Sequence, residues 1–205
     1  MSTMNLSRRR FLQTSAVTGG GLVVGLAVTG CSSTPAPLPV ARTEGAWTPN
    51  AFLQVLPDNT IRFYTARSEM GQGVTTGLAT LVGEELDVDP LNMEIRLAGA
   101  HEDYVNPAFG MQGTGGSTSI RAHYLQLRQV GANTRALILE AASQDLGVPV
   151  SSLSTENGYI VQGASRHPYA DFITTAQSLN IDADAALKPA SQFKYIGQET
   201  RRVDA

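Results

Sequence analysis

Short runs rich in apolar, β-branched and aromatic residues, some of them strictly alternating with polar residues, predict β-strands. The predicted strands are Phe52–Leu56, Ile61–Thr65, Met93–Leu97, Leu153–Glu156 and Tyr159–Gln162. Turn-forming residues, Pro57-Asp58-Asn59-Thr60 and Asn157-Gly158, separate the first two and the last two of these runs. We therefore expect two hairpins and one further strand.

Apolar residues with helical spacing predict helices between and after these strands. One is expected from about Thr76 to Leu86, and a long one from Ser119 to Leu146, where Gly147 and Pro149 end it. A third is expected over Tyr169–Ala176. Because strands and helices interleave, the predicted fold class is α/β, a two-layer domain of a sheet covered by helices.

A glycine-rich run, Ser68–Gly77, lies between a predicted strand and a predicted helix and contains Gly71, Gly73 and Gly77. Glycines let a backbone approach phosphate closely, and the free N–H groups at a helix N-terminus attract anions. The spacing Gly-x-Gly-x-x-x-Gly is one residue longer than the dinucleotide-binding fingerprint. Alone, this run is equally compatible with a plain turn.

A second glycine-rich run, Met111–Ser119, also leads into a predicted helix. Ser117 or Thr118 is expected to cap that helix, which accounts for these two residues but not for the three glycines before them. Two such loops in one small domain indicate an extended phosphorylated ligand that is held at two points.

Both loops carry a family resemblance. The run Glu69–Gly73, followed by Thr75-Thr76 and Glu84–Asp89, is similar to the molybdopterin-binding subunit of the xanthine dehydrogenase and aldehyde oxidase family. Thr114–Ser119, with Arg128 and Gly131-Ala132 on the next helix, resembles the same family. The branch that it resembles most is the isoquinoline 1-oxidoreductase β-subunit type, over about Trp47 to Ala205.

The resemblance implies a molybdopterin cofactor, in its cytosine dinucleotide form, bound by both loops of the complete subunit. The residues that it assigns to cofactor binding are Gly71, Gln72, Gly73, Gln112, Thr114, Gly115, Gly116, Ser117 and Thr118. The metal is held by the cofactor and not by the protein, and the family's catalytic glutamate lies in a C-terminal segment beyond this sequence. We therefore expect the chain alone to be inactive.

The resemblance also implies an activity, the hydroxylation of aldehydes or N-heterocycles with water as the oxygen source. Electrons would pass to an iron–sulfur partner subunit, with a cytochrome as a further candidate acceptor. Family members are several times longer, so the chain is expected to be an N-terminal fragment. The alternative is a non-catalytic exported lipoprotein domain. A nicotinamide enzyme is disfavoured by the glycine spacing and by the export signal.

The N-terminus has the form of a twin-arginine export signal, with Ser7–Leu12 followed by the glycine-diluted apolar stretch Ala16–Val28. Cys31, the only cysteine, lies in a run that resembles a bacterial lipoprotein cleavage box, so we expect it to be lipidated. Cleavage near Ala36, with loss of Cys31, is the alternative. The expected location is the periplasm, with a lipid anchor in the membrane.

Three segments are predicted: an export signal with the lipoprotein-like box (1–31), a Pro/Ser-rich tether (32–46), and an incomplete molybdopterin-binding-type domain (47–205). The formal net charge is −3, and loss of the three arginines Arg8–Arg10 would make it −6. This balance argues against nucleic-acid binding, which needs a basic face.

Several other polar residues are expected to have structural roles. Glu84 and Glu85 are adjacent in a predicted helix and are expected on a solvated face. Glu69 is expected to bond a neighbouring N–H and not to touch a phosphate. The long helix has arginines at seven-residue intervals that we expect to face solvent or a partner: Arg121, Arg128 and Arg135. The histidines share no metal-ligand spacing.

Overall fold

The computed structural model describes residue 40, residues 43–180 and residues 183–204, all in one structural unit. The predicted export signal, Cys31 and most of the predicted tether lie outside the described residues. The elements of the described part interleave strands and helices, which confirms the predicted α/β class.

A four-stranded sheet has the order β1-β2-β3-β4. Its strands are β1 Trp47–Asn50, β2 Leu53–Val55, β3 Ile61–Thr65 and β4 Glu94–Leu97. The first three strands are antiparallel and β4 is parallel to β3, so the predicted first hairpin and the further strand are confirmed. β1 was not predicted, because its proline and asparagine break the strand pattern.

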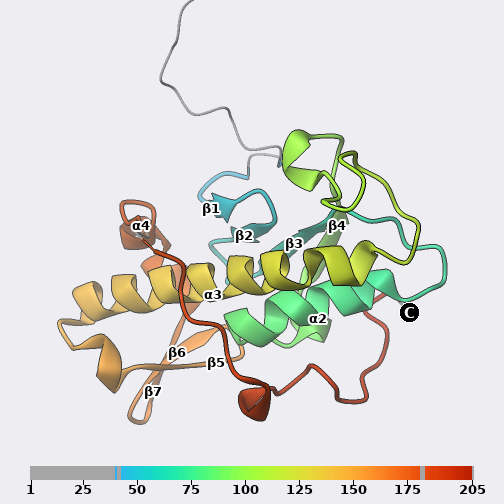
Figure 1. Cartoon of the computed structure of the whole chain (residues 1–205). Helices are drawn as coiled ribbons and strands as arrows, with labels where there is room; N and C mark the ends of the chain where they lie inside the picture. Colours follow the sequence, from blue (N-terminus) through green and yellow to red (C-terminus); the bar gives the residue numbers. More distant parts are fainter. Residues whose placement is uncertain (1–39, 41–42, 181–182, 205) are drawn as a thin grey trace, which may run out of the picture. The chain divides into compact units, whose positions relative to one another are not determined.

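Two helices, α2 (Val74–Leu86) and α3 (Ser119–Leu146), lie side by side and cover one face of this sheet (Figure 1). The long helix has the predicted bounds and ends at Gly147, whose φ of 65° is left-handed. The helices approach closely at Gly131, where an added Cβ would lie 2.6 Å from the carbonyl oxygen of Val82. This approach explains the glycine in the long helix.

A second, three-stranded sheet contains β5 Ser154–Glu156, β6 Tyr159–Gln162 and β7 Ser165–Pro168. The predicted second hairpin is confirmed, but β7 was not predicted. The predicted helix over 169–176 is only partly correct, since a 3₁₀ turn (Tyr169–Phe172) precedes the short α4 (Ile173–Ala176). The remaining 3₁₀ turns are Pro90–Asn92, Glu102–Tyr104, Val150–Ser152 and Ala190–Gln192.

The hydrophobic core lies between the four-stranded sheet and the helices. Its fully buried side chains include Leu53, Phe63, Leu78, Leu127 and Ile138. Residues 183–204, which we call the C-terminal strap, run from the C-terminal end of α2 back towards its N-terminal end (Figure 1).

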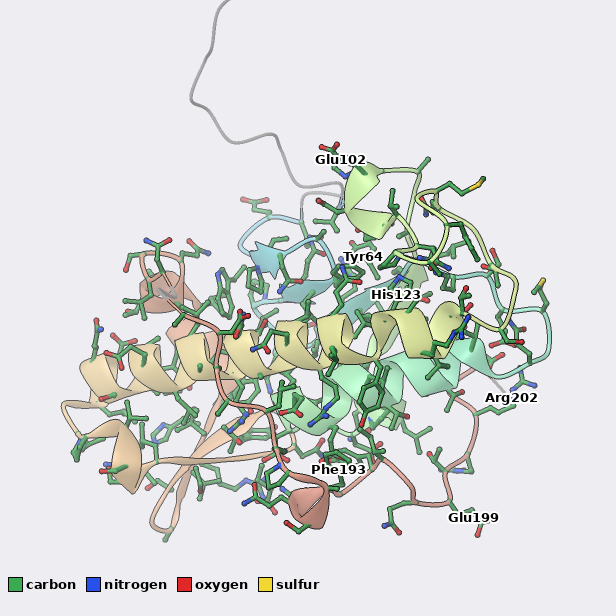
Figure 2. The ribbon with its side chains drawn as sticks, in the orientation of Figure 1. Tyr64, Glu102, His123, Phe193, Glu199 and Arg202 are labelled. Atoms are coloured by element: carbon green, nitrogen blue, oxygen red, sulfur yellow. The ribbon has the colours of Figure 1, made fainter. Side chains whose placement is uncertain are left out.

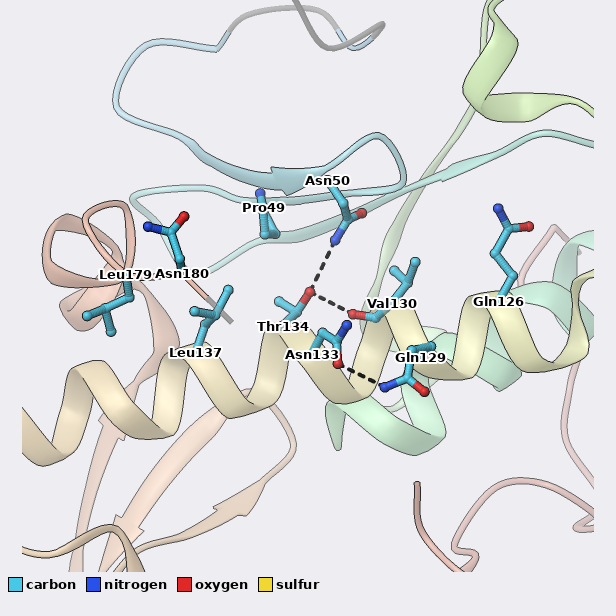
Figure 3. A pocket seen from close by; sticks show the side chains of 10 residues that line it. All are labelled: Pro49, Asn50, Gln126, Gln129, Val130, Asn133, Thr134, Leu137, Leu179 and Asn180. Atoms are coloured by element: carbon cyan, nitrogen blue, oxygen red, sulfur yellow. Dashed lines mark hydrogen bonds between the residues drawn. The ribbon is translucent and has the colours of Figure 1, made fainter. Parts of the chain in front are cut away.

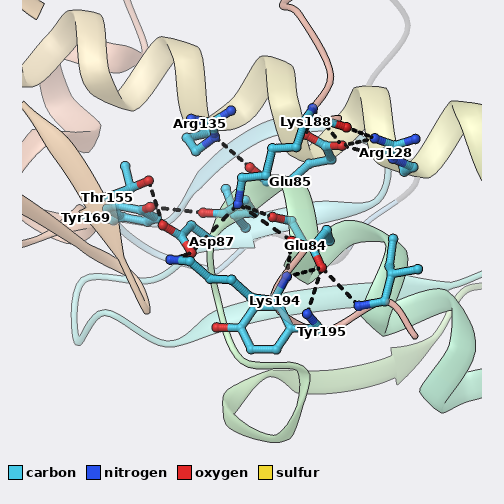
Figure 4. Close-up of polar contacts among 12 residues, drawn as sticks. Glu84, Glu85, Asp87, Arg128, Arg135, Thr155, Tyr169, Lys188, Lys194 and Tyr195 are labelled. Carbon is cyan, nitrogen blue, oxygen red and sulfur yellow. Dashed lines mark hydrogen bonds and ion pairs between the residues drawn. The ribbon is translucent and has the colours of Figure 1, made fainter. Parts of the chain in front are cut away.

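Glu84 and Glu85 hold this strap, and the predicted solvated face is wrong for both, since both are fully buried. Glu84 accepts hydrogen bonds from the backbone N–H groups of Lys194, Tyr195 and Ile196 at 2.8 to 3.1 Å (Figure 4). The prediction failed because these donors are about 110 residues away in the sequence. Buried carboxylates require such donors.

The predicted arginine stripe is also only partly correct. Arg128 is buried, and its Nη2 lies 2.6 Å from a carboxylate oxygen of Glu85. Arg135 donates from Nε to the backbone carbonyl of Glu85 at 2.6 Å (Figure 4). Only Arg121 is exposed, as expected. The other two arginines neutralise the acidic end of α2.

Candidate functional site

The two glycine-rich loops, far apart in the sequence, meet in the structure. The backbone N–H of Ser68 donates to Oγ1 of Thr114 at 2.9 Å, which ties the first loop to the second. A hollow of about 420 Å³, which we call the loop pocket, lies between them. It is lined by Met70, Gln72, Gly73, Val74, Gly77, Thr114, Gly115, Ser117, Ser119 and Ile120.

The loop pocket contains part of the predicted set. Gln72, Gly73, Thr114, Gly115 and Ser117 line it. Gly71, Gly116 and Thr118 are the chain neighbours of lining residues. Gln112 is not brought to the pocket, because its amide bonds the carbonyl of Gly99 and the N–H of His101. The sequence therefore indicated the pocket through its glycines and hydroxyl residues, but not its apolar wall of Met70, Val74 and Ile120.

Gly71 and Gly73 give the first loop its shape. Their φ values of 96° and 77° lie in the left-handed region that favours glycine, and Gly73 is the N-cap residue of α2. A Cβ at either position would extend into open space. The backbone conformation, and not crowding by the protein, therefore explains these two glycines.

Glu69 occupies the donors that the first loop was expected to offer to a phosphate. Its carboxylate accepts the N–H groups of Gly71, Gly73 and Thr75 at 2.8, 2.9 and 3.1 Å. These bonds, that from Thr75 first, lower the pKa of Glu69. The expected bond from Glu69 to a neighbouring N–H is confirmed, and Glu69 satisfies the N–H of Thr75 in the first turn of α2 as well as those of Gly71 and Gly73.

The side chain of Gln72 is engaged inside its own loop. Its Oε1 accepts the N–H of Met70 at 2.6 Å, and its Nε2 donates to the carbonyl of Ser68 at 3.1 Å. The oxygen keeps a second lone pair and the nitrogen a second N–H, so a ligand can still bond this amide with both contacts in place. In the structure, Gln72 thus bridges the backbone of Ser68 and Met70 and stabilises the turn that they form.

The second loop is held differently. Thr118 is at the N-cap position of α3, but among the described residues its side chain makes no capping hydrogen bond to the helix. Its Oγ1 donates to the carbonyl of Gly115 at 2.9 Å and accepts from Nδ2 of Asn106 at 2.8 Å. Ser117 has a left-handed φ of 52°. The predicted side-chain cap is therefore wrong, because both hydroxyl residues belong to the turn before the helix.

Gly115 is the least constrained glycine that lines the loop pocket. Its backbone is outside the left-handed region, and a Cβ there would extend into open space. Neither backbone strain nor packing against the described residues explains a glycine here. Gly113, in the same loop, has the same freedom but does not line the pocket.

The pocket rim carries exposed apolar side chains. Met70 is 69% exposed and Ile120 is 39% exposed, and Met111 on the second loop and Phe109 just before it are exposed as well. Together with the hydroxyls of Thr114, Ser117 and Ser119, this lining can bind a ligand that combines a flat ring with hydrogen-bonding groups.

Arg67, directly before the first loop, was not singled out from the sequence. It is fully buried, and its guanidinium contacts the carbonyl of Ala66 and Nε2 of His123, each at 2.7 Å. Within the described part of the chain, its Nε has no hydrogen-bond partner. No sequence pattern distinguishes this arginine from a surface residue.

His123, labelled in Figure 2, contacts Arg67 on one side and the carbonyl of Ser119 on the other. Burial, and next the charge of Arg67, lower the pKa of His123, so the ring is neutral. Its Nδ1 lies 3.0 Å from the carbonyl of Ser119, which can only accept, so Nδ1 carries the proton and Nε2 accepts from Arg67. Ser119 lines the loop pocket.

A second hollow, of about 450 Å³, lies between α3, the end of β1 and the residues after α4 (Figure 3). Its amides mainly bond to one another or to the strap. Asn133 accepts from Gln129 at 2.8 Å and donates to Asp184 at 2.9 Å, and Asn50 donates to Thr134 at 3.2 Å. These contacts indicate a structural role.

Across the described residues, no three His, Cys, Asp or Glu side chains are grouped so as to bind a metal ion. Among the same residues, no helix is long and apolar enough to cross a membrane.

Comparison with known families gives one match over almost the whole chain. The sequence profile of the molybdopterin cofactor-binding domain matches residues 3–202. A solved structure, quinoline 2-oxidoreductase from Pseudomonas putida 86, aligns over 66% of this chain and 17% of its own, with 15% identity and a TM-score of 0.45.

Three curated proteins are similar in sequence. A membrane-bound aldehyde dehydrogenase [pyrroloquinoline-quinone] of Gluconacetobacter polyoxogenes is 29% identical over 94% of the chain. The β-subunit of isoquinoline 1-oxidoreductase from Brevundimonas diminuta is 30% identical over 85%, and a nicotinate dehydrogenase subunit of Pseudomonas putida is 28% identical over 75%. The matched regions are 25%, 22% and 13% of these relatives, so the chain spans a quarter of their length or less.

Proposed function

The chain belongs to the molybdopterin cofactor-binding domain family, and from this premise we propose that it forms the N-terminal part of a molybdenum hydroxylase subunit. The substrates would be aldehydes or N-heterocycles, with water as the oxygen source and electrons passed to an iron–sulfur partner. The names of the relatives, an aldehyde dehydrogenase and subunits that act on isoquinoline and nicotinate, support these substrate classes.

The loop pocket fits such a cofactor. Thr114, Ser117 and Ser119 offer hydroxyls at one wall, and Met70 and Ile120 offer apolar surface for a flat ring. When bound, the cofactor would supply the redox chemistry at its metal. The chain's residues would bind and orient it. The observation that carries the proposal is Gly115, a glycine in the pocket that neither φ nor packing explains.

The two loops have different proposed roles. The first loop, with Gly71 and Gly73, fixes the shape of the pocket, because its N–H groups already bond Glu69. The second loop, with Thr114 and Gly115, leaves the backbone open to a ligand. We further propose the cytosine dinucleotide form of the cofactor. The catalytic glutamate would lie outside this sequence, and a cytochrome is a candidate acceptor of the electrons.

The test compares Gly115→Val with Gly113→Val in the native subunit, purified with its partner chains. Both positions have ordinary φ and open space, so both variants are expected to fold. The subunit should contain molybdenum and pterin, and Gly115→Val should lose most of both while Gly113→Val retains them. Equal occupancy in the two variants would contradict the loop pocket as the cofactor site.

An absence of molybdenum and pterin from the unmodified native subunit would favour the non-catalytic binding module. Gly73 is a poor probe for this question, because its left-handed φ strains any other residue whether or not a ligand binds. Incorporation of ¹⁸O from labelled water into an aldehyde or N-heterocycle product would test the reaction itself.

We also propose export by the twin-arginine route to the periplasm, with Cys31 lipidated and the Pro/Ser-rich segment as a tether. The support is the Ser-Arg-Arg-Arg-Phe-Leu run and the lipoprotein-like box. Replacement of Arg8 and Arg9 by lysine should leave the precursor in the cytoplasm, and unchanged export would refute this route. A mature N-terminus beyond Ser32, found by mass spectrometry, would refute lipidation.

A further inference from the structure

The C-terminal strap reaches the first glycine-rich loop. Nη2 of Arg202 lies 3.3 Å from the Glu69 carboxylate, and Nη1 donates to the carbonyl of Gly71 at 3.3 Å. The N–H of Val203 donates to Oγ1 of Thr76, in the first turn of α2, at 3.1 Å. Figure 2 shows Arg202 at this end of the molecule. The strap therefore contacts both the loop and the helix that follows it.

Arg202 is itself held in position. Asp204 accepts from its Nη2 at 2.6 Å and from its Nε at 3.1 Å, a two-point contact that orients the guanidinium plane. The strap is fixed further back, where Glu84 accepts three successive backbone N–H groups. The register of the strap on α2 thus brings Arg202 to the loop.

Glu69 is the residue through which this contact would act. Its carboxylate holds three N–H groups of the loop, but it also places a negative charge beside the loop pocket. Arg202 at 3.3 Å restricts the carboxylate to the geometry that organises the loop. Because Asp204 is paired with the same guanidinium, the contact acts through position more than through net charge.

We propose that Arg202 is a positioning residue for the first glycine-rich loop, holding Glu69 and Gly71 in the arrangement that shapes the loop pocket. The consequence for cofactor binding rests on the proposed function, whereas the consequence for the loop does not. Release of the strap from α2 would therefore also withdraw Arg202 and leave the first loop less ordered.

The experiment uses neighbouring arginines in the full chain. Arg202→Met removes the contact, and Arg201→Met removes the same charge from an exposed side chain one residue away. Backbone amide exchange is measured at Gly71, Gly73 and Thr75, with the amides of α3 as an internal reference. Arg202→Lys is the conservative variant, since lysine keeps the charge but not the two-point geometry.

Arg202→Met should raise exchange at the three loop amides about three-fold, the size expected of a partly exposed ion pair. Arg201→Met should change nothing, Arg202→Lys should lie between, and the α3 amides should keep their rates. Equal loop exchange in the two methionine variants would overturn the proposal. So would an increase of the same size throughout α3, which would mean a general loss of stability.

This test needs no bound cofactor, so it is independent of the proposed function. In the native subunit, Arg202→Met should also lower the molybdenum content relative to Arg201→Met. If the loop amides respond while the unmodified subunit contains neither molybdenum nor pterin, the positioning role stands and the proposed function fails.

Discussion

At the scale of single residues, two glycines of the site are explained by backbone conformation and a third only by the proposed ligand. Gly71 and Gly73 adopt left-handed φ values, while Gly115 does not. The same residue type therefore reports two different physical requirements. Only coordinates separate them, because all three glycines are equivalent in the sequence.

Gly73→Ala should lower the free energy of unfolding by about 1 to 2 kcal/mol, the cost of a left-handed conformation for a residue with a Cβ. Gly115→Ala should leave stability unchanged or raise it slightly, because its φ suits alanine. Urea unfolding of both variants measures the difference. Equal stability of the two would contradict the assigned φ at Gly73.

His123 should make stability depend on pH in a narrow window. Its folded-state pKa lies below the ordinary 6.5, so the unfolded chain takes up the proton first and stability falls as the pH drops below about 6.5. The fall stops below the folded pKa. A tenfold difference in proton affinity between the folded and unfolded chains corresponds to about 1.4 kcal/mol.

Unfolding of the wild type and of His123→Gln between about pH 6.5 and pH 5 measures this effect. Glutamine can accept from Arg67 and donate to the Ser119 carbonyl, so the variant should still fold. Its free energy of unfolding should no longer fall as the pH drops through this window. His101→Gln, in a more exposed loop, should keep the pH dependence of the wild type. Retention of the full pH dependence in His123→Gln would exclude His123 as its source. The carboxylates with lowered pKa titrate below this window: Asp58, Glu69, Glu94 and Asp204.

At the scale of elements, the contact between α2 and α3 depends on a missing side chain. A Cβ on Gly131 would lie 2.6 Å from the Val82 carbonyl oxygen and 3.1 Å from the backbone nitrogen of Leu86. Backbone atoms cannot rotate out of the way as a flexible side chain can. The distance between the two helices is therefore set here.

Gly131→Ala should destabilise the protein by about 1 to 3 kcal/mol through overpacking. Alanine in place of a helical glycine ordinarily stabilises by about 1 kcal/mol, so the sign of the effect is diagnostic. Gly77→Ala is the matched control, since its Cβ would meet only the flexible end of Ile120. Thermal unfolding of both variants checks this, and a more stable Gly131→Ala would contradict the close approach.

The elements were largely predictable and their long-range partners were not. The bounds of α3 followed from apolar spacing and from Gly147 and Pro149, because these signals are local. β1 was missed, since Pro49 and Asn50 oppose a strand unless a neighbour pairs with it. Glu84 was misplaced, because its donors are about 110 residues away and a single sequence gives no sign of them.

The candidate site shows the same division. The meeting of two glycine-rich loops was inferred from their composition, and the structure ties them through Ser68 and Thr114. Glu69 was expected to bond an N–H, and it bonds three. Arg67 and His123 were not anticipated, because burial of a charged residue beside a neutral histidine depends on packing alone.

At the scale of the whole molecule, the strap joins the end of the described chain to α2 through buried charge. Glu84, Glu85 and Asp87 face the strap lysines and the arginines of α3 (Figure 4). Such a cluster is stable only while each member keeps its partners. The strap is therefore part of the folded domain.

Glu84→Ala should release the strap and lower the free energy of unfolding by about 3 kcal/mol, since three backbone N–H groups lose their acceptor together. Limited proteolysis should then cleave the chain between Lys194 and Arg202 more rapidly. Glu199→Ala, an exposed acid on the same strap, should keep the wild-type rate. Equal cleavage of both variants would contradict the role of Glu84.

The three N–H bonds of Glu69 also have a consequence for selectivity. A carboxylate tethered in the same loop competes at high effective concentration with any free anion for these donors. Sulfate or inorganic phosphate would bind this loop only through the same three N–H groups. Neither ion should therefore displace the Glu69 carboxylate. The loop amides should keep their chemical shifts in tens of millimolar sulfate in the wild type and move in Glu69→Gln. The carboxylate would thus act as an intramolecular competitor that excludes abundant small anions from the loop. A ligand large enough to contact the second loop as well would still bind.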